Sequence, residues 1–176
     1  MKIKSTKFKD LKVISSPVHT DKRGSFREVF KKNLFLNRKF LFTCASESKK
    51  NVLRGLHLQT KNAQGKYLTV LKGEIFDVAL DLRKNSKTFG KYFSINLSDQ
   101  NGLSIYIPEG FAHGFLALQK NNIITYNCTN YRSEKHELGI KWDDKEINIK
   151  WPIKKPLVSK KDLNNLSLAE YVKIYG

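Results

Sequence analysis

Short stretches in which apolar residues recur between polar ones follow each other along most of the chain, with turn residues between them. Seven of these stretches are rich in β-branched and aromatic residues: KFLFTCAS, YLTVL, EIFDVALDL, KYFSINL, LSIYI, HGFLAL and NIITYNCT. EIFDVALDL alternates clearly, with apolar residues at 76, 78, 80 and 82 on one face and Asp77, Ala79 and Asp81 on the other. At least seven strands at this spacing predict an all-β sandwich or barrel.

Helical pattern is sparse. VFKKNLFLNR predicts a turn or two of helix, and LNNLSLAEYVKIY predicts a helix at the C-terminal end. The glycine in LKGE stands between two apolar runs and predicts a hairpin. No repeat, linker or low-complexity tract divides the sequence, so residues 1–176 are interpreted as one all-β domain with short flanking helices.

The charge of the chain favours an anionic partner. A chain of 176 residues can bury a sizeable core, so a small enzyme is physically possible. The formal net charge of +17 would attract a nucleotide, a nucleic acid or a membrane surface. Lysine supplies most of the cations and is scattered through every segment, however, which a biased amino-acid composition also explains. Arginine is rarer and suits bidentate phosphate contacts, which draws attention to Arg23 and Arg54.

Cysteine content and hydropathy indicate a compartment. Cys44 and Cys128 are too few for a disulfide framework, which favours a reducing environment. The start, MKIKSTKFKDLKVI, contains no apolar run of signal-peptide length, and no later segment approaches the length of a membrane span. We therefore expect a cytoplasmic protein without a membrane partner.

Three polar residues on separate strands are candidates for one pocket. In small β-barrels, polar residues of matching parity converge on the lumen, and His57, His113 and Tyr126 fit this pattern. One such histidine alone is more typical of a hydrogen-bonded core residue. A metal site of the His-x-His type is incomplete, because Gln59 takes the second position and no carboxylate lies between His57 and Glu74. We expect no metal.

The remaining chemistry is acid–base catalysis. A histidine base, a lysine or second histidine that stabilises an oxyanion, and a tyrosine acid suit proton abstraction next to a carbonyl. A carboxylate would orient the base, but the residue pattern leaves open which of the 16 acidic residues does so. Neither cysteine stands beside a histidine, and the sequence has no G-x-S-x-G elbow, phosphate-binding glycine loop or dinucleotide fingerprint. No nicotinamide or ATP cofactor is therefore expected.

Several motifs together resemble those of a known family. DKRGSFRE, VLRGLHLQTKNAQGK, GEIFDVALDLRKNSKTFG, IPEGFAHGFLAL, TYNCTNY, IKWDDKEINIKWPI and SKKD occur in the order typical of the dTDP-4-dehydrorhamnose 3,5-epimerases, from about residue 10 to residue 165. The resemblance implies a cupin-type jelly roll and a homodimer that uses no cofactor. It also implies epimerisation of a nucleotide-linked 4-keto-6-deoxy sugar at the carbons flanking the ketone, C3 and C5, in deoxysugar biosynthesis.

The resemblance also implies roles for individual residues. His57 would be the base that removes the proton at C3 or C5, and Asp162 in SKKD would form a dyad with it. Lys66 would stabilise the enolate oxygen, and Tyr126 would return a proton from the opposite face. The pattern alone also fits plainer roles, namely a helix-terminal acid, a solvated lysine and a cross-strand aromatic.

Further positions match substrate-binding residues of the family. His113, with Asp81 as its partner, matches a second pocket histidine, Arg54 matches a diphosphate-binding arginine, and Gln59 belongs to the same substrate-binding set. Residues that would reach the nucleotide from the neighbouring subunit are Arg23, Phe26 and Glu28. From the residues alone, Arg23 and Glu28 could equally be an exposed ion pair that contributes little to stability.

The sequence departs from the family pattern at three positions. Phe42 and Cys44 stand where family members usually carry glutamine and asparagine, and Arg132 stands where an aromatic residue often follows Tyr131. The nucleotide (dTDP, CDP or GDP), the sugar and the epimerised carbon therefore stay open, and so does a 3,4-ketoisomerase activity. A basic binding module for nucleic acid or acidic polysaccharide is the competing class. Because basic strands with interleaved aromatics are missing, we expect no nucleic-acid partner.

Overall fold

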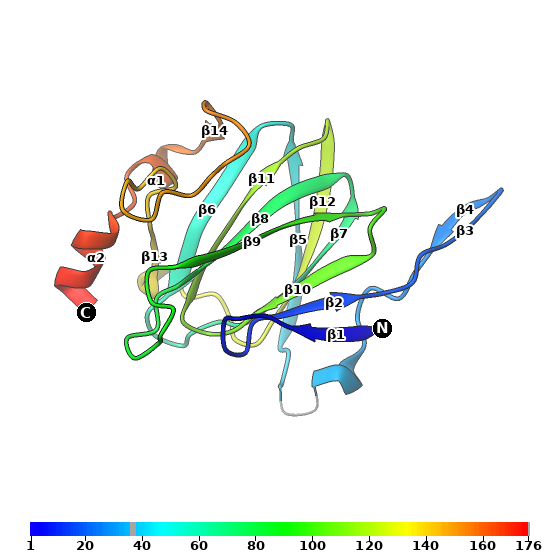
Figure 1. Cartoon of the computed structure of the whole chain (residues 1–176), viewed down its shortest axis with the longest axis horizontal. Coiled ribbons are helices and arrows are strands. Elements are labelled where there is room, and N and C mark those ends of the chain that lie inside the picture. The colour runs from blue at the N-terminus through cyan, green and yellow to red at the C-terminus, as the bar shows by residue number, and fades with distance from the viewer. Residues whose placement is uncertain (36–37, 176) are drawn as a thin grey trace.

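Two β-sheets face each other across an apolar core in the computed structural model, which describes residues 1–35 and 38–175 (Figure 1). In spatial order, the first sheet consists of β1 (Lys2–Ser5), β2 (Lys12–Ser15), β10 (Leu103–Ile107), β7 (Lys66–Lys72), β12 (Asn121–Cys128) and β5 (Phe42–Lys49). The second consists of β13 (Glu137–Gly139), β6 (Val52–Gln59), β11 (Phe111–Ala117), β8 (Glu74–Asp81) and β9 (Tyr92–Ser98), with β14 (Leu157–Val158) parallel to β6. The chain crosses repeatedly between the sheets, which is the topology of a jelly roll.

Smaller elements flank the sheets. They are the hairpin of β3 (His19–Asp21) and β4 (Gly24–Phe26), the 3₁₀ turns η1 (Lys32–Phe35) and η2 (Glu134–His136), and the helices α1 (Lys160–Leu163) and α2 (Leu168–Tyr175). The helical turn predicted within residues 29–38 is η1, and Leu36 and Asn37 of that stretch lie outside the described residues. The predicted C-terminal helix is α2.

The predicted hairpin at LKGE is wrong. Gly73 does form a turn, at a φ of +84°, but β7 pairs with β10 and β12 while β8 pairs with β9 and β11. The turn therefore carries the chain from one sheet to the other. The glycine is required because a Cβ atom there would lie 2.3 Å from the carbonyl oxygen of Asn121.

Strand β8 shows how the sheets divide the core. Its apolar face packs outward, where Val78, Leu80 and Leu82 share a cluster with Leu168 and Tyr171 of α2. Its other face points between the sheets, where Ala79 belongs to the central core. The two aspartates that flank Ala79 are consequently buried as well. A strand buried on both faces is thus what brings carboxylates into the interior of the sandwich.

The N-terminal part leaves the body of the molecule. Figure 1 shows the β3–β4 hairpin projecting away from the two sheets, on the side opposite the C-terminal helix. A phenylalanine at the end of β4, Phe26, is 69% exposed, which is unusual for a ring of this size. Among the described residues, no helix has the length and apolar character needed to cross a membrane.

Candidate active site

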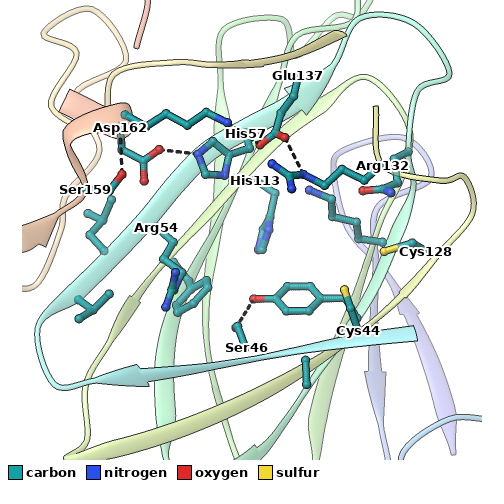
Figure 2. A pocket seen from close by; sticks show the side chains of 18 of the residues that line it. Cys44, Ser46, Arg54, His57, His113, Cys128, Arg132, Glu137, Ser159 and Asp162 are labelled. Carbon is teal, nitrogen blue, oxygen red and sulfur yellow. Dashed lines mark hydrogen bonds and ion pairs between the residues drawn. The ribbon is translucent and has the colours of Figure 1, made fainter. Parts of the chain in front are cut away.

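A cavity of about 580 Å³ opens at one end of the sandwich, between the two sheets. The structure gathers six of the predicted site residues along its walls, namely Arg54, His57, Lys66, His113, Tyr126 and Asp162 (Figure 2). His57 comes from β6 of the second sheet and Tyr126 from β12 of the first, so they stand on facing walls. Polar residues predicted to share one pocket therefore do share one.

His57 and Asp162 form a short hydrogen bond. The distance from His57 Nε2 to Asp162 Oδ1 is 2.5 Å, and the carboxylate is 5% exposed. Asp162 lies in the first turn of α1, where the side chain of Ser159 caps the helix by accepting from the Asp162 amide. Burial raises the pKa of Asp162, but the hydrogen bond and charge of His57 outweigh it, so the pKa lies below its usual value. The carboxylate is therefore ionised and orients the ring.

The backbones of β6 and β11 approach each other closely beside Asp162. The amide of Gly55 donates to the second carboxylate oxygen of Asp162 at 3.3 Å. Gly55 has a φ of +121°, and a Cβ atom there would lie 2.5 Å from the Cα of Gly114 on β11. Only glycine fits, because β6 and β11 run too close for a side chain. The sequence RGLH thus supplies both the backbone donor and the histidine.

A second histidine, His113, comes from the same sheet as His57, and its ring contacts Tyr126 of the other sheet. His113 faces His57 across the β6–β11 pair, and its ring centroid is 6.3 Å from that of Tyr126. His113 Nε2 lies 2.7 Å from Asp77 Oδ2, and both side chains are buried. Asp77 Oδ1 has no hydrogen-bond partner among the described residues. Both members of this pair belong to the second sheet, and the His113 ring contacts Tyr126 of the first.

Tyr126 and Lys66 place a phenol and an amine at the cavity. The Tyr126 hydroxyl lies 3.0 Å from Ser46 Oγ on β5. Burial raises the pKa of Tyr126 despite this hydrogen bond, so the phenol keeps its proton at neutral pH. Burial lowers the pKa of Lys66, partly offset by nearby acidic groups that include Glu137 and Asp77. No hydrogen bond or ion pair engages the Lys66 ammonium within the part of the chain described, so it is available to a substrate oxygen.

Arg54 presents a cation at the outer part of the cavity. Its guanidinium donates to Ser48 Oγ and to the Glu47 carbonyl, both at 3.0 Å. No carboxylate pairs with it in the described residues, and the side chain is exposed. A guanidinium held by neutral acceptors keeps its full charge for an anionic ligand.

Known proteins of one family match this chain over nearly all its length. The family model described as dTDP-4-dehydrorhamnose 3,5-epimerase covers residues 5–170. The chain belongs to the dTDP-4-dehydrorhamnose 3,5-epimerase family. The epimerase of Methanothermobacter thermautotrophicus is 46% identical over 165 residues, which are 90% of this chain and 89% of the relative. That of Shigella flexneri is 45% identical over 93% of this chain and 94% of its own.

Solved structures of the epimerase family agree in fold. The Legionella pneumophila epimerase, solved in complex with dTDP-4-keto-L-rhamnose, superposes with a TM-score of 0.90 at 37% identity, covering 96% of this chain and 93% of its own. The predicted cupin-type jelly roll is thereby confirmed. Family membership makes the chain an isomerase that acts on a nucleotide sugar, and this decides against a non-catalytic basic binding module.

The predicted partner of His113 is wrong. The histidine bonds Asp77, not Asp81. Both aspartates share the inward face of β8, and Ala79 lies directly opposite His113, so the two carboxylates are its diagonal neighbours in opposite directions. Asp81 is instead held at the end of the strand by Arg83, Ser86 and Thr88, with Arg83 Nη2 at 2.7 Å. Asp81 therefore holds the segment after β8 and does not contact His113.

This carboxylate gives a stability prediction. Burial raises the pKa of Asp81, but the bonds from Arg83, Ser86 and Thr88 outweigh it and hold the pKa below the usual value of an aspartate. Its contribution is therefore present above pH 4 and is lost as pH falls through the lower folded pKa. We expect Asp81→Asn to cost about 3 kcal/mol at pH 7, since it removes the buried carboxylate that pairs with the half-buried Arg83 guanidinium. Urea unfolding at pH 7 and pH 3 should show this difference shrinking at the acidic pH, and an equal difference at both would contradict the assignment.

The Gln59 side chain bonds the backbone of neighbouring loops. Its side chain does not line the cavity; its amide donates to the carbonyls of Asn62 and Tyr131, and its oxygen accepts from the Ser133 amide at 2.8 Å. Because these bonds hold the backbone on both sides of residue 132, Gln59 fixes the loop after β12. A substrate-binding role for its side chain is not what this geometry offers.

The predicted nucleotide-binding residues of the N-terminal segment lie outside the cavity. Arg23 and Phe26 are on the projecting hairpin, and Glu28 follows it. The alternative of an Arg23–Glu28 ion pair is wrong, because Arg23 bonds Asp21 and Glu28 bonds Lys31. No contact of these three residues with the chain's own cavity is described.

The three departures from the family pattern all lie at the cavity. Phe42 stacks on Tyr131 with ring centroids 5.8 Å apart, and Cys44 lies opposite Tyr126 on the adjacent strand. Burial raises the pKa of a second cavity thiol, Cys128, to about 12. Arg132 lines the mouth and bonds Glu137. At Phe42 and Cys44 the wall is therefore aromatic and sulfur-containing where the family pattern is polar, and at Arg132 it is charged where the family pattern is aromatic.

Sequence reasoning missed several residues that shape the site. Ser159 was detectable, since S-x-x-D before a helix is an N-terminal capping pattern. Asp77, Ser46 and Glu137 carried no such signal, because strand register and loop position bring them to the cavity. Within the described ranges, no group of three or more histidine, cysteine or acidic residues has the arrangement of a metal site.

Proposed function

We propose that this epimerase inverts a carbon next to the ketone of a dTDP-linked 4-keto-6-deoxy sugar, with His57 as base and Tyr126 as acid. The observation that carries the proposal is their placement on facing walls of one cavity, the base in a dyad with Asp162. Inversion requires that a proton leave one face of the carbon and arrive on the other. Two groups on opposite walls meet this requirement.

The base follows from the hydrogen bonding of the dyad. With His57 Nε2–H donating to Asp162, the lone pair of the neutral ring is on Nδ1. This nitrogen takes the proton from the carbon next to the ketone. The ionised carboxylate stabilises the imidazolium that forms, as in other histidine–aspartate pairs.

The cation and the phenol complete the reaction. When the carbon–hydrogen bond breaks, its electron pair moves toward the ketone and places negative charge on the oxygen, which the Lys66 ammonium stabilises. The Tyr126 hydroxyl then donates its proton to the opposite face of the same carbon. Exchange with solvent returns the imidazolium and the phenolate to their starting states, so no cofactor is consumed.

Arg54 supplies the diphosphate contact in this proposal. One charge-assisted bond to phosphate contributes roughly 1.5–3 kcal/mol, which is about 10-fold to 100-fold in affinity. We expect Arg54→Ala to raise KM by about 10-fold to 100-fold, with a smaller effect on kcat. Steady-state kinetics check this, with Lys50→Ala as a control that removes one positive charge outside the cavity. A fall in kcat at unchanged KM would refute the phosphate role.

We also propose a homodimer in which the β3–β4 hairpin reaches the partner's cavity. The hairpin projects away from the two sheets (Figure 1). Its exposed residues Arg23 and Phe26 are not among those that line the chain's own cavity. An aromatic ring and a guanidinium suit a nucleobase and a phosphate. The epimerase without this hairpin would therefore bind nucleotide weakly.

The dimer is tested by mass and by binding. Sedimentation should give twice the chain mass of 20.4 kDa. We expect Phe26→Ala to weaken dTDP binding by about tenfold, since loss of one aromatic contact costs about 0.5–1.5 kcal/mol beyond its buried area. Isothermal titration measures this, and Val172→Ala on α2 is a matched apolar control. A monomer that binds dTDP at full strength would overturn the arrangement.

Product analysis tests the function itself. The protein is incubated with dTDP-, CDP- and GDP-linked 4-keto-6-deoxyglucose, and the products are assigned by NMR. We expect inversion at C3, C5 or both with the dTDP sugar. Migration of the ketone to C3 would instead show a 3,4-ketoisomerase.

A further inference from the structure

A cluster of three charged side chains crosses the rim of the cavity beside the dyad. Arg132 Nε donates to one oxygen of the Glu137 carboxylate at 2.9 Å (Figure 2). Lys161 Nζ donates to the other oxygen at 3.1 Å. The Glu137 side chain is 12% exposed, whereas each of the two cations is 57% exposed. A half-buried carboxylate that pairs with two cations from separate segments joins those segments.

One of the joined segments is α1, which carries Asp162. Of the residues of α1, only Asp162 is buried, and Leu163 is 57% exposed, so apolar packing holds this four-residue helix weakly. Among the described bonds of its side chains, those of Lys161 and Asp162 are the ones that reach other parts of the fold. The Lys161 ion pair is therefore one of the contacts that fix the dyad carboxylate, beside the pairing of β14 with β6 before the helix and the bond from Asn165 to the Gly55 carbonyl after it.

The other joined segment is the loop after β12. Gln59 bonds the backbone of Tyr131 and of Ser133, and these two bonds fix the backbone of Arg132 between them. In the β6–β13 pair, Glu137 lies opposite Gln59 and Gly139 lies opposite His57. Glu137 is therefore a diagonal neighbour of the histidine on the same face of the sheet. The pairing of β13 with β6 therefore fixes the backbone of Glu137 next to the strand that carries the base.

We propose that Glu137 is a positioning residue of the epimerase: by holding Lys161 it fixes the short helix that presents Asp162 to the base. This rests on the proposed function, which assigns His57 as the base. Arg132 supports the arrangement by holding the second oxygen of the Glu137 carboxylate. Burial raises the pKa of Glu137, but the bonds and charges of Lys161 and Arg132 outweigh this effect. The pKa therefore lies below its usual value, and the carboxylate is ionised at neutral pH.

The size of the effect follows from orientation. Misplacing a catalytic group by about 1 Å can cost about 100-fold in rate. Asp162 keeps its bonds to His57 and to the Gly55 amide when Glu137 is changed, so the loss should be smaller. We expect Glu137→Gln to lower kcat about tenfold and to change KM less than twofold.

Glu134→Gln is the matched control. Glu134 also bonds Arg132, at 3.0 Å, but its side chain is 79% exposed and does not line the cavity. Both variants remove one negative charge next to the same guanidinium. Only Glu137→Gln disconnects α1, so the control should retain wild-type kcat within twofold.

The decisive measurement is the effect of Glu137→Gln in an Asp162→Asn background. NMR follows the residual exchange of substrate hydrogen with deuterated water over hours. If Glu137 acts through Asp162, it has less than a twofold effect once that carboxylate is gone, and Lys161→Met reproduces the Glu137→Gln loss in the wild-type background. A purely structural defect would lower activity equally in both backgrounds.

Each outcome is informative. Equal kcat for Glu137→Gln and wild type, or a full tenfold loss in the Asp162→Asn background, would overturn the inference. If Glu137→Gln fails to fold, Lys161→Met carries the same comparison. If the wild-type protein itself turns over no 4-keto sugar in the same assay, the proposed function fails instead, independently of Glu137.

Discussion

Replacing His57 by alanine should lower turnover by about 10²–10⁴-fold while leaving the fold intact, because a general base contributes about that much. An ionised carboxylate orients the His57 imidazole, through the 2.5 Å bond to Asp162. Removing it leaves Lys66 and Tyr126 in place, so substrate binding and enolate stabilisation persist. The expected loss is therefore in kcat, with KM changed only slightly.

Steady-state kinetics and circular dichroism check this prediction together. His136→Ala is a suitable control, since that histidine lies outside the cavity and its ring bonds Ser133. The control should keep turnover within about threefold. Near-full activity of His57→Ala would reassign the base, for which His113 would be the next candidate on the same wall.

Replacing Tyr126 by phenylalanine should separate proton removal from inversion. The variant keeps the ring that packs near His113 but loses the hydroxyl that bonds Ser46. His57 still removes the proton, and the resulting imidazolium can return a solvent-derived one to the same face. We expect formation of the inverted product to fall by about 10²–10⁴-fold while exchange with solvent continues.

Mass spectrometry and NMR in deuterated water measure both events at once. Label should enter substrate of unchanged configuration in Tyr126→Phe, and inverted product should be scarce. Tyr175→Phe removes a hydroxyl from α2, outside the cavity, and should behave as wild type. Equal losses of exchange and inversion in Tyr126→Phe would mean that the phenol is needed for proton removal as well.

Periodicity predicted the principal strands, and it missed the short ones for a physical reason. EIFDVALDL is β8 and NIITYNCT is β12, each long enough to alternate visibly. By contrast, β1 and the β3–β4 hairpin are short and exposed on every residue. Strands without a buried face carry no hydrophobic period, so backbone pairing alone defines them.

The candidate site shows a similar division. Residue type and strand parity brought His57, His113 and Tyr126 to one pocket, and the structure places them there. Strand parity alone did not show which aspartate of β8 bonds His113, since Asp77 and Asp81 share a face. In the structure the partner is Asp77. The carboxylate of the dyad is separated from its histidine by 105 residues, so only the family resemblance pointed to Asp162.

The rim cluster was beyond any pattern in the sequence. Glu137 and Lys161 lie 24 residues apart on a short strand and a short helix, and neither element has a strong period. Their meeting depends on how β13 and α1 dock on β6. Tertiary docking of this kind is set by packing over the whole sandwich.

The central claim concerns where the hydrogen on the inverted carbon comes from. The wild-type epimerase is incubated with dTDP-4-keto-6-deoxyglucose in deuterated water, and NMR locates deuterium in the product. The two-wall arrangement of His57 and Tyr126 predicts one deuterium at each inverted carbon and none elsewhere on the ring. Inverted product that retained its original hydrogen at that carbon would contradict it, since the proton would then have been carried across by a single group.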